Sequence, residues 1–484
     1  MSAPLDDDQR RFVASFRAFL DQVVHDARLA VSGTGPTLAD VVSEHLGADA
    51  TRLPVVREEV REHQYVDVDV ALAALAAEHG GERVVGVGGG DQRHHSSFGD
   101  LLSGVFARFE VAAVDHVHLP TGPDTSRRAV GFGGRLLRVD GVPVAVLQRS
   151  AHRQYGREPG LEVVAAQEGT AARLLEEVRR TALERSVLRG QVLSFDGSPY
   201  DPAAGGITFL RRPSVAAADV VLPEGALERV VRHVVGVGEQ AQRLTAAGQH
   251  LKRGVLLHGP PGTGKTHTVR HLLSVTPGTT AVLLSGLGLR HVATAAHLAR
   301  ALQPALVVLE DCDLVAEDRS QHAGDQPLLF ELLDAMDGLD GDADVAFLLT
   351  TNRADRLERA LAQRPGRVDL AVEVPLPDER ARRALLRLYA RGLPLSPAAL
   401  DAAAVRAAGT TASFTRELLR RAVLLAATDG REVADGDLAA ALEELLSDAE
   451  ALTRALLGSG GRTAAGPAEV DGALDPDVGW DDFA

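Results

Sequence analysis

The spacing of hydrophobic residues divides the chain into regions, and the first division falls near residue 80. Apolar residues recur at three- and four-residue steps between residues 6 and 30, which predicts an amphipathic helix. A second apolar stretch with a helical pattern covers residues 71–77. We therefore expect residues 1–80 to form an N-terminal helical segment.

Beyond Arg83 the pattern changes to short runs rich in valine and leucine, separated by glycine-rich turns. Residues 135–139 and 142–147 are two such runs, and the Asp-Gly pair between them is typical of a tight turn joining antiparallel strands. We expect residues 81–215 to form an α+β accessory domain.

From about residue 216 the chain alternates helical stretches with short apolar runs. Runs without polar alternation are expected in a parallel sheet, because its strands are buried on both faces. The candidate strands are residues 254–257, 280–284, 305–309 and 346–350. We expect residues 216–375 to form an α/β core around such a sheet.

Only helical patterns remain between about Asp378 and Leu457, so residues 376–457 are expected to form a helical domain. The last stretch, residues 458–484, is rich in glycine, alanine and aspartate and has no basic residue after Arg462. Such a composition predicts an acidic flexible tail.

The composition of the 484 residues narrows the class of protein. Hydrophobic residues make up 45% and charged residues 24%, close to the averages for globular proteins. The formal net charge of −16 argues against a surface that coats nucleic acid. The single cysteine, Cys312, excludes a disulfide framework and a multi-cysteine metal site, as expected in a reducing compartment.

The sequence also predicts a cytoplasmic location. The N-terminus is acidic at Asp6, Asp7 and Asp8, where a signal peptide would be basic and then apolar. The longest uncharged stretch, residues 272–289, contains a proline and several glycines, so we expect no membrane span.

One motif carries a specific chemistry. Between the apolar run at residues 255–257 and the next helical stretch, the chain reads Gly259-Pro260-Pro261-Gly262-Thr263-Gly264-Lys265-Thr266-His267. This segment fits the G-x-x-x-x-G-K-[ST] pattern, in which glycines let the backbone wrap a polyphosphate at a helix N-terminus. Lys265 would contact the β- and γ-phosphates, and Thr266 would ligate Mg²⁺. An ordinary turn would not need a lysine in a chain whose only other lysine is Lys252.

Two acids follow the apolar run at residues 306–309. Carboxylates at the carboxyl end of such a strand lie where α/β proteins bind ligands. We expect Glu310 to hold Mg²⁺ and Asp311 to polarise the attacking water. The usual order of the two acids is reversed, so the water-side acid is one methylene shorter, and hydrolysis is either slow or uses a repositioned water.

Three further polar residues are candidates for the same site. Asn352 follows the run at residues 347–351, where it binds the water or the γ-phosphate, or alternatively forms a turn or helix cap. Arg364 and Arg367 flank a Pro-Gly turn. They stabilise the charge of phosphoryl transfer, in their own or a neighbouring subunit, or they belong to an ordinary salt-bridging surface.

In this order, the motifs resemble those of the classic AAA clade of the AAA+ ATPases, over about residues 219–457. Residues 332–338 and the segments around Thr351-Asn352-Arg353 and Arg364-Pro365-Gly366-Arg367 add to the resemblance. The resemblance implies ATP as the nucleotide, a helical lid at residues 376–457 and a ring, usually a hexamer, with the site between subunits. It also implies that Asn352 is the sensor 1 residue and that Arg364 and Arg367 are arginine fingers.

The chain departs from this family at three places. The interval at residues 286–292 lacks the aromatic residue of the family's pore loop, and Leu287 and Leu289 there either line a pore or pack beneath the following helix. The lid segment at residues 409–416 departs from the family's common Gly-Ala-Asp sequence, and Arg416 there is either a contact to phosphate or a helix-surface arginine. No His-Glu-x-x-His motif follows the lid, so the sequence does not predict an attached zinc protease.

The accessory region contains histidines that invite a metal interpretation. His116 and His118 would share one face of a strand, and His94 and His95 are adjacent. Because we find no convincing third ligand, we expect ordinary histidines rather than a metal site.

Together these features predict Mg²⁺-dependent ATP hydrolysis that drives remodelling, chaperone-like handling or translocation of a protein client by an oligomeric ring. Residues 1–215 would recognise or dock the client. The alternatives are a nucleotide-gated scaffold with slow or negligible hydrolysis and, less favoured, a nucleic-acid motor.

Overall fold

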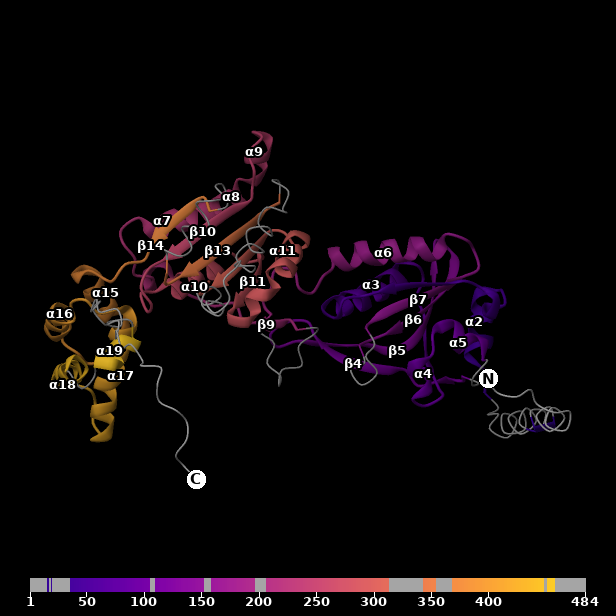
Figure 1. Cartoon of the computed structure of the whole chain (residues 1–484), viewed down its shortest axis with the longest axis horizontal. Coiled ribbons are helices and arrows are strands. Elements are labelled where there is room, and N and C mark those ends of the chain that lie inside the picture. The colour runs from indigo at the N-terminus through magenta and orange to yellow at the C-terminus, as the bar shows by residue number, and fades with distance from the viewer. Residues whose placement is uncertain are drawn as a thin grey trace, which may run out of the picture.

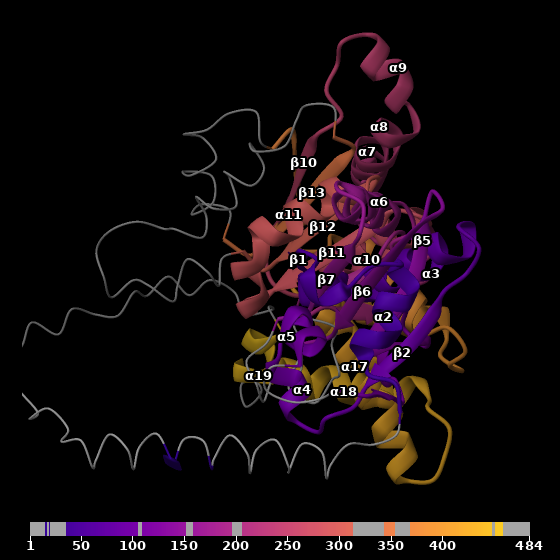
Figure 2. The ribbon, with the colours of Figure 1, turned by 90° about the vertical axis from the view of Figure 1, so that its right-hand side faces the viewer.

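The computed structural model describes residues 15–16, 19, 35–104, 109–151, 158–195, 206–312, 343–353, 368–447 and 451–457. All but three residues of the helix expected at 6–30, and the whole tail expected at 458–484, lie outside these ranges. The described chain contains an accessory sheet with its helices, a second sheet with its helices, and a helical domain (Figure 1). In Figure 2 the accessory sheet lies in front of the second sheet.

The accessory sheet is antiparallel throughout, with the strand order β1-β7-β6-β5-β2-β3 and with β4 paired to β5. Its strands are β1 (Val55–Glu59), β2 (Arg83–Val87), β3 (Val111–Ala112), β4 (Asp115–Pro120), β5 (Ser126–Val139), β6 (Val142–Arg149) and β7 (Gly160–Ala165). The predicted hairpin is the β5–β6 pair. Asp140 (φ 49°) and Gly141 (φ 81°) both adopt the left-handed conformation that a two-residue type I′ turn requires.

Helices cover both faces of this sheet. On one face α3 (Tyr65–Glu78) and α6 (Thr170–Glu184) pack against side chains such as Val146 and Val163. On the other, α2 (Leu38–Leu46) and α5 (Phe98–Ser103) pack against the neighbouring Leu147 and Val164, because successive strand residues face opposite sides. The remaining short elements are a 3₁₀ turn at Ala50–Arg52, a second at Glu62–Gln64, and α4 (Gln92–His95).

The structure therefore divides the N-terminal half differently from the predicted segments. The predicted boundary at residues 80/81 falls between α3 and β2, inside one unit. Helices α2 and α3 bury their apolar faces on the sheet formed by the later strands, and β1 pairs with β7 along Val55↔Val164. A helical pattern reports only that a face is apolar, and says nothing of which strands will cover it.

The second sheet has the order β14-β10-β13-β12-β11-β8-β9 and is parallel except for β9. Its strands are β8 (Val192–Ser194), β9 (Thr208–Leu210), β10 (Arg253–His258), β11 (Thr280–Ser285), β12 (Ala305–Glu310), β13 (Val345–Thr351) and β14 (Leu370–Glu373). All four predicted core strands are confirmed, as is the predicted α/β fold class. Strands β8 and β9 come from the region predicted to be accessory, so the boundary expected at residue 215 lies after two strands of this sheet.

Helices cover both faces of the second sheet as well. Helix α11 (Val292–Ala301) packs on one face, and α7 (Ala226–Val231) and α10 (Lys265–Val275) pack on the other. The shorter elements are a 3₁₀ turn at Ala217–Asp219, a π-helical turn at Arg232–Gly236, α8 (Val237–Glu239), α9 (Ala241–Ala246) and a 3₁₀ helix at Gly286–His291.

The helical domain consists of α15 (Glu379–Tyr389), α16 (Pro397–Arg406), α17 (Ala412–Thr428), α18 (Asp435–Leu446) and α19 (Ala451–Leu456). Asp378, Ser396 and Thr411 each cap a helix by accepting a hydrogen bond from its first turn. Over the described ranges, every helix falls short of the length and apolarity that crossing a bilayer requires.

Candidate nucleotide-binding site

The glycine-rich loop lies between the end of β10 and the start of α10, at the carboxyl edge of the parallel sheet. Gly259 (φ 148°), Gly262 (φ 74°) and Gly264 (φ 114°) adopt backbone conformations that other residues rarely reach. A Cβ atom on Gly259 would lie 2.1 Å from the Val374 carbonyl oxygen. The glycines are therefore required by the path of the loop, which turns its backbone toward the first turn of α10, where N–H groups have no intrahelical acceptor.

Lys265 is the first residue of α10, and only 6% of it is exposed. Its Nζ donates to the carbonyl oxygens of Gly259 and Pro260, both at 2.9 Å, and to Asn352 Oδ1 at 2.7 Å. Three neutral oxygens thus satisfy the three N–H donors of the ammonium group. An anionic phosphate oxygen is a stronger acceptor than any of them, so the side chain is placed to exchange these partners for a polyphosphate.

The residues expected to hold the metal lie next to each other. Burial raises the pKa of the Glu310 carboxyl, and the nearby Thr266 hydroxyl opposes this rise. Glu310 Oε1 is buried and, in the described part of the chain, has no hydrogen-bond partner. A buried carboxylate oxygen without a partner, beside a hydroxyl, fits a hard divalent cation such as Mg²⁺, which binds oxygen ligands and would satisfy that oxygen.

Asp311 and Asn352 meet across the ends of β12 and β13. Asn352 Nδ2 donates to Asp311 Oδ1 at 3.3 Å, while Asn352 Oδ1 accepts from Lys265. The side-chain amide of Asn352 therefore links the Lys265 ammonium group to the Asp311 carboxylate. Asp311 itself has a positive φ of 51°.

The other predicted site residues are placed as follows. The Thr263 hydroxyl donates to the Pro260 carbonyl oxygen within the loop. The His267 ring lies 3.1 Å from the carbonyl oxygen of Asp219, so it contacts the segment that runs beside α10. Arg364 and Arg367, like residues 332–338, lie outside the described residues.

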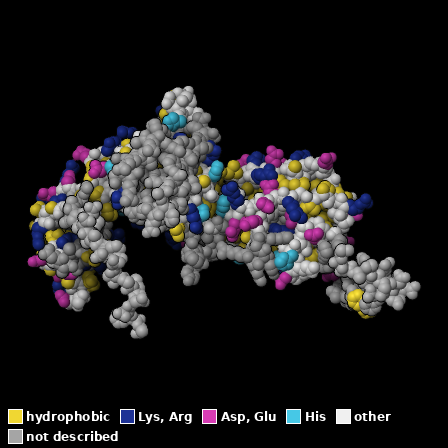
Figure 3. Space-filling model, viewed as in Figure 1, with side chains coloured by type: hydrophobic (Ala, Val, Ile, Leu, Met, Phe, Trp, Pro, Cys, Tyr) yellow, Lys and Arg dark blue, Asp and Glu magenta, His cyan; other side chains and the backbone are white. Residues whose placement is uncertain are grey.

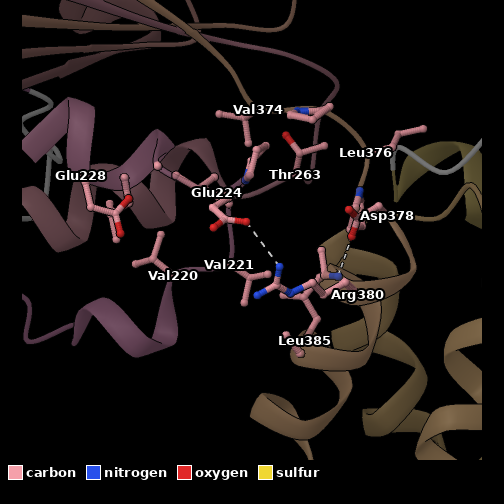
Figure 4. A pocket seen from close by; sticks show the side chains of 18 of the residues that line it. Val220, Val221, Glu224, Glu228, Thr263, Val374, Leu376, Asp378, Arg380 and Leu385 are labelled. Atoms are coloured by element: carbon pink, nitrogen blue, oxygen red, sulfur yellow. Dashed lines mark hydrogen bonds and ion pairs between the residues drawn. The ribbon is translucent and has the colours of Figure 1, made fainter.

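A pocket of about 570 Å³ opens beside Thr263 (Figure 4). Its other lining residues lie between 217 and 228 and between 374 and 385, and include apolar side chains such as Val221 and Leu385. Glu224 and Arg380 pair across it at 3.5 Å. The sequence did not predict this pocket, because its walls come from parts of the chain that are far apart: residues between 217 and 228, Thr263, and residues between 374 and 385. The cue was the apolar run Val220-Val221-Leu222 near the start of the predicted core.

The segment leading to this pocket, residues 211–222, which we call the strap, runs along α10. At the carboxyl end of α10, Arg212 donates to the carbonyl oxygens of Leu273 (2.7 Å) and Thr276 (3.1 Å). Further along, the Val215 carbonyl oxygen accepts from Ser274 and contacts His271. Next to Arg212, at the start of the strap, Arg211 pairs with Asp124 in the turn between β4 and β5 at 2.6 Å, and both side chains are exposed. The strap thus connects the accessory sheet to the pocket.

The helical domain contacts the glycine-rich loop directly. The Ser413 backbone N–H donates to the Gly262 carbonyl oxygen at 3.1 Å. The Leu457 carbonyl oxygen accepts from the Thr411 hydroxyl at 2.6 Å and would lie 3.0 Å from a Cβ on Gly262. Arg416 is exposed on α17, near Tyr389. The start of α17 and the Leu457 carbonyl group are therefore parts of the domain that contact the loop.

The two leucines of the 286–292 interval have different environments. Leu289 is 5% exposed and belongs to the core beneath α11, whereas Leu287 is 79% exposed. His291, at the end of the same 3₁₀ helix, stacks on Phe195 at a ring distance of 5.5 Å. The packing alternative is therefore confirmed for Leu289, whereas Leu287 is exposed.

The accessory histidines have ordinary partners. His116 Nδ1 lies 3.2 Å from the Ala129 carbonyl oxygen. Within the described ranges, no three His, Cys, Asp or Glu side chains gather in a way that could hold a metal ion by themselves.

Comparison with known proteins agrees with this geometry. Residues 255–376 match the family described as "ATPase family associated with various cellular activities (AAA)". The chain is 34% identical over 261 residues to the ATP-dependent zinc metalloprotease FtsH 2 of Sphaerobacter thermophilus, covering 51% of this chain and 39% of that protein. It is 32% identical over 239 residues to the proteasome-activating nucleotidase of Methanothermobacter thermautotrophicus, covering 46% of this chain and 57% of that protein.

Residues 255–376 thus form an AAA domain, in agreement with the predicted resemblance to the AAA clade of the AAA+ ATPases. It spans between about two fifths and three fifths of the length of these relatives. The matched region contains the glycine-rich loop from Gly259, the acids at the end of β12 and Asn352.

Proposed function

We propose that the chain binds Mg²⁺·ATP in the site described above, hydrolyses it, and uses the cycle to remodel a protein client within an oligomeric ring. The observation that carries the proposal is the convergence of Lys265, Glu310, Asp311 and Asn352 at one edge of the sheet. Relatives named as an ATP-dependent protease and a proteasome-activating nucleotidase support a protein client.

Binding follows from the loop and the pocket. Backbone N–H groups at the start of α10 and the Lys265 ammonium hold the phosphates, and the helix dipole adds to their attraction. The neighbouring pocket takes the adenine and ribose, because it opens at Thr263 and has apolar walls at Val221 and Leu385. The pocket lies between the core and α15, so a bound nucleotide contacts both domains.

Each polar residue of the site has a separate role in hydrolysis. Thr266 and Glu310 would hold Mg²⁺, which when bound neutralises charge on the β- and γ-phosphates. The water oxygen attacks the γ-phosphorus, the bond to the β–γ bridging oxygen breaks, and the water proton passes to Asp311. The Asn352 amide orients Asp311 through their hydrogen bond. By the family resemblance, Arg364 and Arg367 complete the site of a neighbouring subunit.

The strap gives this site a connection to the accessory region. Its hydrogen bonds to α10 involve Arg212, Val215 and Asp219, and Arg211 pairs with Asp124 in the turn between β4 and β5. A client bound to the accessory region would change the affinity of the pocket for nucleotide through the strap, and nucleotide would change the affinity for the client in return.

The metal requirement tests the proposal. Phosphate release, measured over a range of protein concentrations, should stop when EDTA removes Mg²⁺. Glu310→Gln keeps the shape of the side chain but loses its charge, so it should raise the Mg²⁺ concentration for half-maximal turnover by about ten- to hundredfold. The matched control is Glu373→Gln, at an exposed position on β14. Unchanged Mg²⁺ dependence in Glu310→Gln would contradict the assignment of this residue.

A substitution of Leu287 tests the second part of the proposal, the handling of a protein client. This leucine projects from the 3₁₀ helix at Gly286–His291 and is the candidate contact for an unfolded chain, in place of the missing aromatic residue. An unfolded probe such as reduced, carboxymethylated lactalbumin should stimulate the ATPase. Leu287→Asp should reduce the ratio of stimulated to unstimulated rates to about one, because a charged side chain cannot bury apolar surface.

The control for Leu287→Asp is Leu183→Asp, which changes an exposed leucine on α6. Equal stimulation of the Leu287→Asp and wild-type chains would show that another surface grips the client.

A nucleotide-gated scaffold is the second candidate function, because the water-side acid is an aspartate rather than a glutamate. Single-turnover measurements separate the two, since a scaffold would hold ATP far longer than a working ATPase. A nucleic-acid motor has less support. On the face drawn in Figure 3 the described acidic and basic side chains are interspersed, and the net charge is −16.

A further inference from the structure

The backbone at Asp311 is unusual. Among the residues that the structure describes, Asp140 and Asp311 are the two non-glycine positions with positive φ. Asp140 lies in the turn between β5 and β6, where a left-handed conformation is required. Asp311, with φ 51°, directly follows β12 at the carboxyl edge of the sheet, next to the lysine and the acid of the site.

A single residue of the neighbouring strand holds this conformation. The backbone N–H of Asp311 donates to Thr350 Oγ1 at 3.0 Å, and the next N–H, of Cys312, donates to the Thr350 carbonyl oxygen at 3.0 Å. The regular pairing of β12 with β13 runs as far as Leu309↔Leu349. Beyond that point the Thr350 hydroxyl accepts from the Asp311 N–H, and the Thr350 carbonyl oxygen accepts from the Cys312 N–H. The chain therefore turns within one residue.

Thr350 is only 1% exposed and lies in a strand that is buried along its whole length. Without the Thr350 hydroxyl, the Asp311 N–H would lose its hydrogen-bond acceptor in a partly buried place, which is costly. The hydroxyl is therefore placed to favour the left-handed backbone over an extended one.

We propose that Thr350 is a positioning residue for hydrolysis: its hydroxyl holds residue 311 in the left-handed conformation that brings the Asp311 carboxylate to Asn352. The inference rests on the proposed ATPase function. It also explains the reversed order of the acids. Aspartate and asparagine tolerate this conformation better than longer side chains do, so the backbone turn selects aspartate at position 311. The direction of the backbone, rather than the length of the side chain, then decides where the carboxylate lies.

Thr350→Val tests the hydroxyl, because valine has nearly the shape of threonine but cannot accept the hydrogen bond. We expect kcat for Mg²⁺·ATP to fall at least about tenfold, while the KM and the dissociation constant of ATP stay within about twofold. Thr350→Ser keeps the hydroxyl and should restore most of kcat. A residue that only packs the core would not produce this split or this rescue.

The control for a lost buried hydroxyl is Thr280→Val. Thr280 is fully buried at the start of β11, the opposite end of the sheet, and its hydroxyl donates to the Leu302 carbonyl oxygen. This variant should lose stability but keep kcat. If Thr350→Val retains wild-type kcat, or if Thr280→Val and Thr350→Val lower it equally, the inference is overturned.

Asp311→Glu tests the explanation of the acid order. If side-chain length limited catalysis, glutamate would raise kcat. We expect the opposite, a fall of about tenfold or more, because glutamate strains the left-handed backbone and displaces the carboxylate. A kcat equal to or above that of the wild type would refute the inference. If the wild-type chain itself does not turn over ATP, the proposed function fails and this inference fails with it; wild-type turnover with unaffected variants removes only the inference.

Discussion

Replacing Lys265 with alanine is expected to abolish ATP turnover and to weaken ATP binding about a hundredfold or more. The ammonium group would make at least two charge-assisted hydrogen bonds to phosphate oxygens, each contributing about 1.5–3 kcal/mol, and about 1.4 kcal/mol corresponds to a tenfold change. Phosphate release and the binding of a fluorescent ATP analogue measure the two effects.

The chain provides its own control for this variant, because Lys252 is its only other lysine. Lys252 lies just before β10, outside the glycine-rich loop. The Lys252→Ala variant should therefore keep ATP turnover within about twofold of the wild type. Lys265→Ala also removes the donor to Gly259, Pro260 and Asn352, so its thermal unfolding should be compared with that of the wild type. Normal ATP affinity in a folded Lys265→Ala chain would contradict the assignment of the loop.

Replacing Asp311 with asparagine is expected to separate binding from hydrolysis. Asparagine fits the left-handed backbone at this position but cannot accept the water proton. Since a general base contributes about 10²- to 10⁴-fold, kcat should fall by that range while the affinity for ATP stays within a few-fold. Single-turnover hydrolysis and equilibrium binding, measured on the same preparation, give the two quantities.

Asp401→Asn, on the surface of α16, is the matched control for this change and should behave as the wild type. Two results would contradict the role of Asp311. One is hydrolysis at the wild-type rate, and the other is a loss of ATP affinity as large as that of Lys265→Ala. If the wild-type chain is as slow as Asp311→Asn, the scaffold function gains support instead.

Features that depend on neighbouring residues in the sequence could be predicted. The four strands of the core were found because each is a short apolar run, and the glycine-rich loop was found because its spacing is dictated by the turn itself. The hairpin at Asp140-Gly141 belongs to the same class, since two left-handed residues define the turn. In each case the physical cause acts over a few residues.

Features that depend on distant residues could not be predicted in this way. Strand β8 joins the core sheet by pairing with β11, some ninety residues later in the chain, for example Val192↔Ala281, and β9 joins it by pairing with β8. The pocket beside Thr263 is lined by residues from distant parts of the chain, and the Asp311 N–H donates to the Thr350 hydroxyl of another strand. The sequence offered a reversed acid pair but not the backbone turn that accommodates it.

The central claim is that the chain binds Mg²⁺·ATP through the Lys265 loop. Calorimetric titration of the wild-type chain with Mg²⁺·ATP tests this claim most directly. We expect a saturable heat corresponding to one nucleotide per chain. This heat should disappear in Lys265→Ala and persist in Asp311→Asn. A folded wild-type chain that takes up no nucleotide, or a heat that is the same in Lys265→Ala, would contradict it.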